Sequence, residues 1–305
     1  MIQVTGLSKY YSNNRAIEKL NFEVGQGDIV GLLGLNGAGK STILKILGCY
    51  LAPSAGEAVI NGISIHESPQ EVRKLIGYLP DTPPLYDEMT VIEWLDFAAR
   101  LKNVGGSVVS RYVDDAISKT GLGGVANDRL GSLSHGYRQR AGIAQAIVHQ
   151  PKVLILDEPI NGLDPVQIVE MRDLILSLKG NHTVILSSHI LSEITRTCDR
   201  ILVIDKGSLV AEGSEAELEK SISGQDEINL QWEGDFDKVV AGIEGLPGVQ
   251  GVEKKNSSRW HEIAIKIQSD ENVDIANVVV SNGAFLRSMT GSENGLESLF
   301  MKLVN

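Results

Sequence analysis

The amino-acid sequence predicts an α/β protein with a mostly parallel β-sheet, followed by a small α+β domain. Strand-like and helix-like segments alternate over residues 1–220, and the strand-like segments 153–156 and 183–186 are continuously apolar. Continuous apolar strands are typical of a parallel sheet that helices cover on both faces. Residues 226–305 follow another pattern, with elements in the order β-α-β-β-α-β, which is typical of a ferredoxin-like domain.

Hydrophobic periodicity defines the elements of the first part in order along the chain. We expect the shorter early strands to form an antiparallel addition to the main sheet. One helix should follow a glycine-rich loop at 34–42. The other expected elements are strands at 2–5, 20–24, 28–33, 57–60, 76–79, 153–157, 183–187, 200–205 and 208–212, and helices at 91–101, 109–120, 135–149, 165–179 and 190–197.

The second part begins after a linker-like segment at 221–225 that is rich in serine and glycine. We therefore expect domains at 1–220, with a helical insert at about 82–150, and at 226–305. The second domain lacks a nucleotide loop and a Cys or His cluster, so a structural or regulatory role, a ligand sensor and a partner dock all stay open. Its expected elements are strands at 227–232, 249–254, 262–268 and 285–290, and helices at 236–243, 273–282 and 295–303.

Composition narrows the class of protein. The chain has 305 residues, of which 42% are hydrophobic and 22% charged, as in ordinary folded proteins. A net charge of −11 argues against broad affinity for nucleic acid. No apolar run approaches the roughly 20 residues that cross a bilayer, and the first residues do not resemble a signal peptide. We therefore expect a cytosolic protein with two reduced cysteines, Cys49 and Cys198, whose membrane role would depend on a partner.

The loop at 34–42, Gly-Leu-Asn-Gly-Ala-Gly-Lys-Ser-Thr, matches the phosphate-binding pattern G-x-x-x-x-G-K-[ST]. A strand precedes it and a helix follows, so backbone N–H groups and the helix N-terminus can surround phosphates. Lys40 should reach the β- and γ-phosphates, and the Ser41 hydroxyl should ligate Mg²⁺. The candidate nucleotide-binding residues of the loop are Gly34, Asn36, Gly37, Ala38, Gly39, Lys40, Ser41 and Thr42.

Two acids end the buried strand at 153–157. Ligands bind at the carboxyl ends of strands in open α/β sheets, so we expect Asp157 to hold Mg²⁺ through water. Glu158 is the adjacent carboxylate and could polarise a water for attack on the γ-phosphate.

A second anion-binding surface is expected at the start of the helix that follows Leu133. Ser134 is a natural N-cap, and Gly136 leaves a backbone N–H accessible. One nucleotide does not need two such surfaces from one chain. We therefore expect this surface to close on a γ-phosphate that another subunit holds.

Taken together, these motifs resemble those of the ATP-binding cassette proteins, the ATPase subunits of ABC transporters. The resemblance covers roughly residues 1–215, with the motifs in family order. It implies a Walker A loop at 34–42, a Walker B strand ending at Asp157 and a catalytic glutamate at Glu158. It also implies a signature at 133–137, a D-loop at 161–164, a switch histidine at His189 that contacts the γ-phosphate, and Tyr11, with Tyr10 as its rival, stacking on adenine.

Three positions depart from the family pattern. In the signature, His135 replaces the usual first glycine and Tyr137 replaces glutamine, while Ser134 and Gly136 remain. Asp81 stands where the family usually has glutamine, and could orient a water on Mg²⁺. The resemblance gives Asp81 catalytic and metal-binding roles, although its reach toward the attacking water is short.

The resemblance implies a homodimer that binds ATP and Mg²⁺ and hydrolyses ATP to drive a separate integral membrane permease. The protein would be peripheral on the cytoplasmic face of the membrane, without nucleic acid as a partner. The spellings at 77–80 and 133–140 are most similar to bacterial type-2 exporters, among them the gliding-motility-type ATPase subunits. A soluble ABC ATPase that acts on ribosomes or nucleic-acid complexes, and an ordinary kinase or GTPase with a phosphate loop, are the alternatives.

Overall fold

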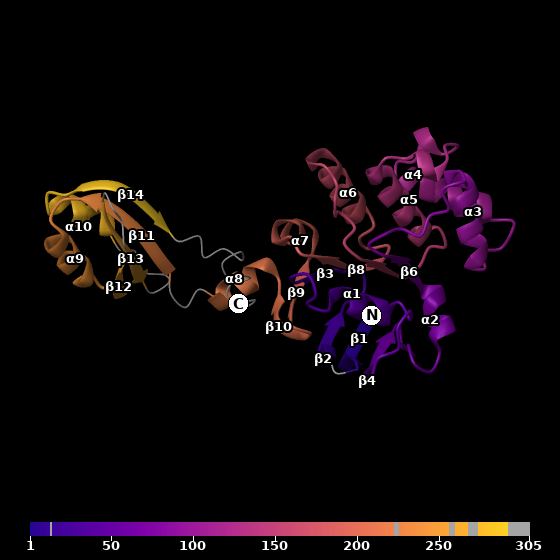
Figure 1. The fold of residues 1–305 in the computed structure, drawn as a ribbon, viewed down its shortest axis with the longest axis horizontal. Coiled ribbons are helices and arrows are strands. Elements are labelled where there is room, and N and C mark those ends of the chain that lie inside the picture. The colour runs from indigo at the N-terminus through magenta and orange to yellow at the C-terminus, as the bar shows by residue number, and fades with distance from the viewer. Residues whose placement is uncertain (13, 223–225, 256–259, 268–273, 292–305) are drawn as a thin grey trace. The chain divides into compact units, whose positions relative to one another are not determined.

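A computed structural model describes residues 1–305 except 13, 223–225, 256–259, 268–273 and 292–305 (Figure 1). Contacts divide the chain into two compact units, Met1–Ser214 and Glu215–Asn305. Helix α8 (Glu215–Ile222) belongs to the second unit by its contacts. The helix expected at 295–303 lies outside the described residues.

A six-stranded sheet forms the centre of the first unit, in the order β10-β9-β3-β8-β7-β6. Five neighbouring strands are parallel and β10 is antiparallel to β9, which confirms the predicted mostly parallel sheet. Every residue of β3, β6, β7 and β8 is buried, as expected for a sheet covered on both faces. The strands are β3 (Ile29–Leu33), β6 (Ile76–Leu79), β7 (Val153–Leu156), β8 (Thr183–Ser188), β9 (Arg200–Asp205) and β10 (Ser208–Gly213).

An antiparallel sheet in the order β2-β1-β4-β5 forms a second layer. Its first two strands are longer than predicted, because their pairing continues past several bulges from Ile2 with Val24 to Tyr11 with Asn14. The bulges interrupt the alternation of apolar and polar residues that marks a strand in the sequence. The strands are β1 (Ile2–Tyr11), β2 (Asn14–Val24), β4 (Ala55–Ile60) and β5 (Ile63–Ser64).

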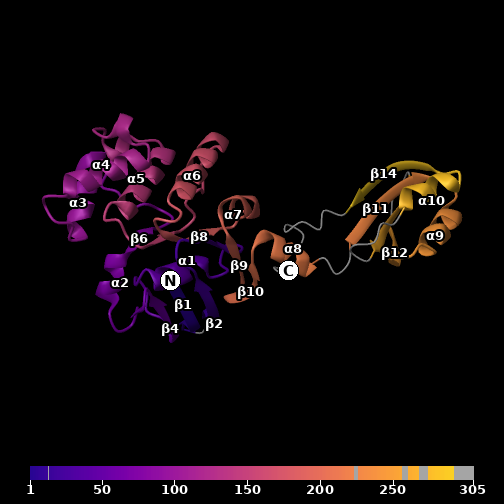
Figure 2. The same ribbon diagram turned by 180° about the vertical axis from the view of Figure 1, so that it is seen from behind.

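Helix α1 (Lys40–Leu47) lies between the two sheets (Figures 1 and 2). Its apolar residues join one core cluster with residues of both sheets. Complete burial of an aliphatic side chain of this size contributes about 1.5–3 kcal/mol. This packing fixes the helix N-terminus, and with it the glycine-rich loop, against the main sheet.

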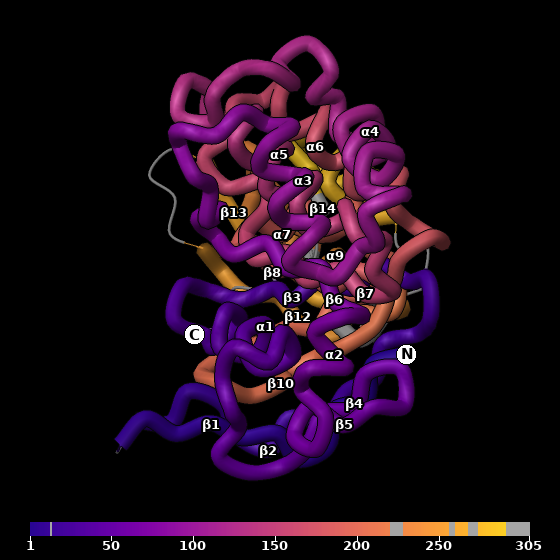
Figure 3. The backbone as a smooth tube through the Cα atoms, turned by 90° about the vertical axis from the view of Figure 1, so that its right-hand side faces the viewer, coloured from indigo at the N-terminus to yellow at the C-terminus, as the bar shows by residue number. Residues whose placement is uncertain are grey.

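The helical insert lies on the side of the main sheet away from the antiparallel layer (Figures 1 and 3). Thr90 and Glu93 form a capping box that fixes the start of its first helix. The insert contains α3 (Val91–Leu101), α4 (Val109–Lys119), 3₁₀ turns at Gly123–Val125 and Leu130–Ser132, and α5 (His135–Ile147). The other helices of the unit are α2 (Pro69–Leu75), which the sequence did not predict, α6 (Pro165–Ser177) and α7 (Leu191–Thr197).

The second unit has a four-stranded antiparallel sheet in the order β12-β13-β11-β14, with the predicted β-α-β-β-α-β sequence of elements. Helices α9 and α10 contribute residues to its apolar core, in which Trp232 is fully buried. The elements are β11 (Asp226–Glu233), α9 (Phe236–Glu244), β12 (Val249–Lys255), β13 (His261–Ile267), α10 (Ile275–Ser281) and β14 (Phe285–Gly291).

Candidate functional site

The carboxyl ends of four parallel strands bring the predicted site residues to one edge of the main sheet. The glycine-rich loop follows β3, Asp81 follows β6, the acidic pair follows β7, and His189 follows β8. Strand β8 lies between β3 and β7. The residues that end β8 can therefore contact both the loop and the acidic pair.

The loop depends on glycine at two positions where backbone approaches closely. A Cβ atom at Gly34 would lie 2.4 Å from the carbonyl oxygen of Ile204. A Cβ atom at Gly39 would lie 2.7 Å from the carbonyl oxygen of Ala16, and Gly39 also has a φ of +109°. Side chains at these positions would displace the loop from β2 and β9.

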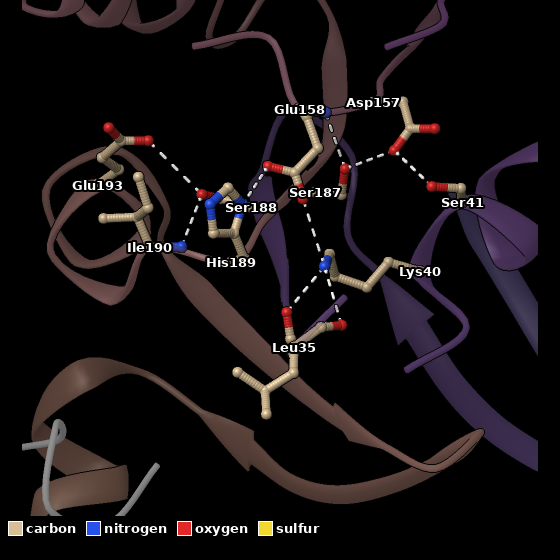
Figure 4. Close-up of polar contacts among 11 residues, drawn as sticks. Leu35, Lys40, Ser41, Asp157, Glu158, Ser187, Ser188, His189, Ile190 and Glu193 are labelled. Carbon is tan, nitrogen blue, oxygen red and sulfur yellow. Dashed lines mark hydrogen bonds and ion pairs between the residues drawn. The ribbon is translucent and has the colours of Figure 1, made fainter. Parts of the chain in front are cut away.

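Lys40 is almost completely buried, with 5% of its side chain exposed. Its ammonium donates to the carbonyl oxygens of Gly34 (2.7 Å) and Leu35 (3.4 Å) and lies 3.3 Å from Glu158 Oε1 (Figure 4). A buried cation at the base of the loop is suited to bind the phosphates of a nucleotide.

Asp157 is buried behind the loop and accepts two hydroxyl hydrogen bonds. Ser41 Oγ donates to Asp157 Oδ1 over 3.1 Å, and Ser187 Oγ donates to the same oxygen over 2.7 Å. Burial raises the pKa of the Asp157 carboxyl, the two hydroxyl bonds lower it in part, and the nearby charges of Asp81 and Glu158 raise it. The hydroxyls therefore help to keep the carboxylate ionised.

Glu158 connects the loop to the end of β8. Its backbone lies in the left-handed region, with a φ of +49°, which costs a residue with a side chain about 1–2 kcal/mol. Its N–H donates to Ser187 Oγ over 2.8 Å, and its Oε2 lies 2.9 Å from His189 Nδ1 (Figure 4). The strained backbone and these partners hold the carboxylate between Lys40 and His189.

A cavity of about 570 Å³ opens over the loop. Tyr11 lines it, and the Lys9 ammonium lies 5.4 Å from the centre of the Tyr11 ring. Of the predicted residues, the lining contains Tyr11, Asn36, Gly37, Gly39, Lys40, Ser41, Thr42, Asp81, Glu158 and His189. It also contains five residues that the sequence analysis did not propose as site residues, Asn14, Arg15, Ala16, Leu35 and Asn161.

Five predicted residues are not in that lining. Ala38 and Asp157 are buried behind it, and Gly34 supports the loop from beneath. Gly136 lines a different cavity, of about 460 Å³, together with Tyr137, and the adjacent Ser134 caps α5 by accepting the N–H of Tyr137. One chain therefore does not bring the signature residues to its own phosphate loop.

Comparison with known proteins identifies the family. A family model described as ABC transporter matches residues 17–161. The bacitracin transport ATP-binding protein BcrA of Bacillus licheniformis is 34% identical over 306 residues, which cover 100% of this chain and 97% of that protein. The chain belongs to the ABC transporter ATP-binding proteins. As a member of this family, it binds and hydrolyses ATP.

Other members agree with this assignment. The ABC transporter ATP-binding protein NatA of Bacillus subtilis is 32% identical over 249 residues, which cover 80% of this chain and 100% of that protein. A solved ATP-binding subunit of an ABC transporter is 31% identical with a TM-score of 0.66, over 72% of this chain and 92% of the other. A dimeric bacterial ABC transporter cassette is 26% identical with a TM-score of 0.65, over 70% and 98% of the two chains. None of the helices in the described part of this ABC ATPase has the length and apolar character needed to span a membrane.

Proposed function

We propose that this ABC ATPase powers an exporter as a homodimer in which two copies enclose two molecules of ATP. Each nucleotide would lie between the phosphate loop of one copy and the signature residues of the other. ATP binding would close the dimer and hydrolysis would reopen it, and a separate membrane permease would convert this movement into transport.

The separation of the two phosphate-binding surfaces is the observation that supports this proposal. Lys40, Glu158 and His189 meet in the cavity over the loop, whereas Ser134 and Gly136 lie outside it. In a two-fold dimer, the cavity over the loop of each copy can face Ser134 and Gly136 of the other copy. Both sites form together, because an isologous interface repeats every contact.

We propose a role for each residue of the site, supported by its position and contacts. Lys40 would exchange its carbonyl partners for phosphate oxygens, and Glu158 would accept a proton from the attacking water. His189 would hold the Glu158 carboxylate and contact the γ-phosphate. Tyr11 would stack on adenine, and Ser134 and Gly136 would bind the γ-phosphate held by the other copy.

The oxygen atoms of Ser41 and Asp157 fit a magnesium ion. They lie 3.1 Å apart, and Mg²⁺ prefers a small number of protein oxygens together with water and substrate phosphates. The ion would neutralise phosphate charge when bound. Asp81 lines the cavity over the loop together with Ser41, and its carboxylate would orient a water molecule bound to the metal.

The proposals of export and of a permease partner are supported by different observations. BcrA, which matches this chain over its full length, is named a bacitracin transport protein. In the helical insert, Tyr86 is 54% exposed while its ring lies 5.2 Å from that of Trp94 and 6.0 Å from that of Phe97. The exposed Tyr86 ring, which packs beside the buried Trp94 and is close in sequence to Asp81, would contact the permease at the cytoplasmic face of the membrane.

Affinity capture from solubilised membranes of the source organism tests the partner. We expect a polytopic membrane protein to copurify in defined stoichiometry and to raise the ATPase rate when both are reconstituted in vesicles. Substituting Tyr86→Ser should weaken that association while leaving the ATPase rate of the isolated subunit unchanged. Copurification with ribosomes or nucleic acid in place of a membrane protein would favour the soluble alternative.

A further inference from the structure

His135 occupies a signature position where the family usually has glycine, and its side chain makes a specific contact. His135 is the first residue of α5, directly after the N-cap Ser134. Its Nε2 lies 3.1 Å from the carbonyl oxygen of Asn161, in the loop between Glu158 and α6. A carbonyl oxygen can only accept, so Nε2 carries the proton and donates it.

The same loop is bonded to the backbone of Glu158. The N–H of Asn161 donates to the carbonyl oxygen of Glu158 over 3.1 Å. Two consecutive hydrogen bonds, from His135 to Asn161 and from Asn161 to Glu158, therefore join the start of α5 to the backbone of Glu158. Glu158 is held in a left-handed conformation, so small shifts of this backbone change the direction of its carboxylate.

The structure fixes the rest of this loop as well. Gly162 has a φ of +74°, and a Cβ atom there would lie 3.2 Å from His135 Nε2, so the ring sits tightly over the turn. Asp164 ends the loop by accepting the N–H groups of Val166 and Gln167 as the cap of α6. Contacts therefore hold both ends of this loop, at His135 and at the start of α6.

We infer that His135 couples the two nucleotide sites of the dimer, an inference that rests on the proposed function. In the dimer, the start of α5 binds the nucleotide of the other copy, while Glu158 of the same chain acts on the nucleotide in its own loop. The contact from His135 through Asn161 to Glu158 joins these two sites. Binding of ATP at one site then positions the catalytic carboxylate of the other, and hydrolysis is cooperative in ATP.

Steady-state ATPase assays over a range of ATP concentrations test the coupling. The wild type should show a Hill coefficient above one. His135→Ala should lower kcat about 3- to 10-fold, the value of one hydrogen bond, and bring the Hill coefficient close to one. ATP affinity of the single chain should stay within about twofold, because His135 is outside the cavity over the loop.

Two further variants separate coupling from a general loss of structure. His135→Gln retains an amide N–H at a similar reach and should recover most of the rate and the cooperativity. His66→Ala replaces another exposed histidine, in the turn after β5, and should behave as wild type. Wild-type kcat and Hill coefficient in His135→Ala would overturn the inference, as would a His135→Gln variant as defective as His135→Ala.

A dimerisation assay distinguishes failure of the coupling from failure of the dimer. Dimer formation by the Glu158→Gln variant with ATP is measured by light scattering, with and without His135→Ala. We expect the dimer in both cases. Cooperativity that survives His135→Ala in a protein that dimerises refutes the coupling alone, whereas a chain that stays monomeric with ATP refutes the dimer and the coupling together.

Discussion

Ser187 supports both acids of the site, and replacing it with alanine should impair stability and hydrolysis together. Its hydroxyl donates to Asp157 and accepts the N–H of Glu158, and the side chain is fully buried. A hydrogen bond to a charged group contributes about 1.5–3 kcal/mol, and an unpaired buried N–H costs about 1–3 kcal/mol. Some relaxation is expected, so we predict a loss of about 3 kcal/mol of unfolding free energy.

The same substitution should move the pH dependence of hydrolysis in a known direction. The Ser187 hydrogen bond lowers the pKa of Asp157 against the raising effect of burial. Without it, the pKa rises further and the carboxylate is protonated at higher pH. The acidic limb of the kcat profile should therefore shift to higher pH in Ser187→Ala, with a lower kcat at acidic pH.

Urea unfolding measures the loss of stability, and steady-state ATPase assays at several pH values measure the shift of the pH profile. Ser177→Ala is a control for the loss of a serine hydroxyl. This exposed residue also donates a hydrogen bond, to the carbonyl oxygen of Leu174 at the end of α6, away from the acids. An unshifted acidic limb, or a Ser187→Ala protein as stable and active as Ser177→Ala, would refute the reasoning from these contacts.

Three other predictions follow from the structure. Glu158→Gln should bind ATP but hydrolyse it about 10²–10⁴-fold more slowly, as measured by single-turnover assays; a normal rate would remove Glu158 as the base. Burial lowers the pKa of His149 from 6.5 to about 4. Between these pH values, His149 is therefore mostly neutral in the folded state and mostly protonated in the unfolded chain. Stability should then rise by about 3 kcal/mol from pH 4 to 6.5, and His149→Gln should flatten this rise in urea titrations. Deleting residues 226–305 should leave ATP affinity unchanged within about twofold by fluorescent-nucleotide titration, because Met1–Ser214 has a separate hydrophobic core. A loss of affinity would show that nucleotide binding depends on the second unit.

The main sheet could be predicted from the sequence because its physical signals are local. A pattern of only a few residues is enough to recognise each apolar strand, the glycine-rich loop and the acids after Leu156. Their meeting at one edge followed from the general geometry of parallel sheets. Helix α2 (Pro69–Leu75) was missed because only Val72 is buried in it, which leaves no apolar periodicity to detect.

The parts of the site that could not be predicted depend on contacts between distant segments. Arg15 lines the cavity because of how β2 meets the loop, which no motif records. The left-handed backbone of Glu158 is stabilised by Ser187, a residue 29 positions away. The bond between His135 and Asn161 likewise depends on the packing of α5 against the loop before α6.

Mixing two inactive variants tests the shared nucleotide sites most directly. Lys40→Ala removes the cation proposed to bind phosphate in one copy, and Ser134→Arg blocks the proposed signature surface of the other. A mixed dimer has one site with both changes and one site with neither. The account predicts that each variant alone is inactive and that an equal mixture recovers at most about a quarter of the wild-type rate, since half of the dimers are mixed and each has one intact site. A mixture of folded variants that stays inactive, or full activity of Ser134→Arg alone, would contradict it.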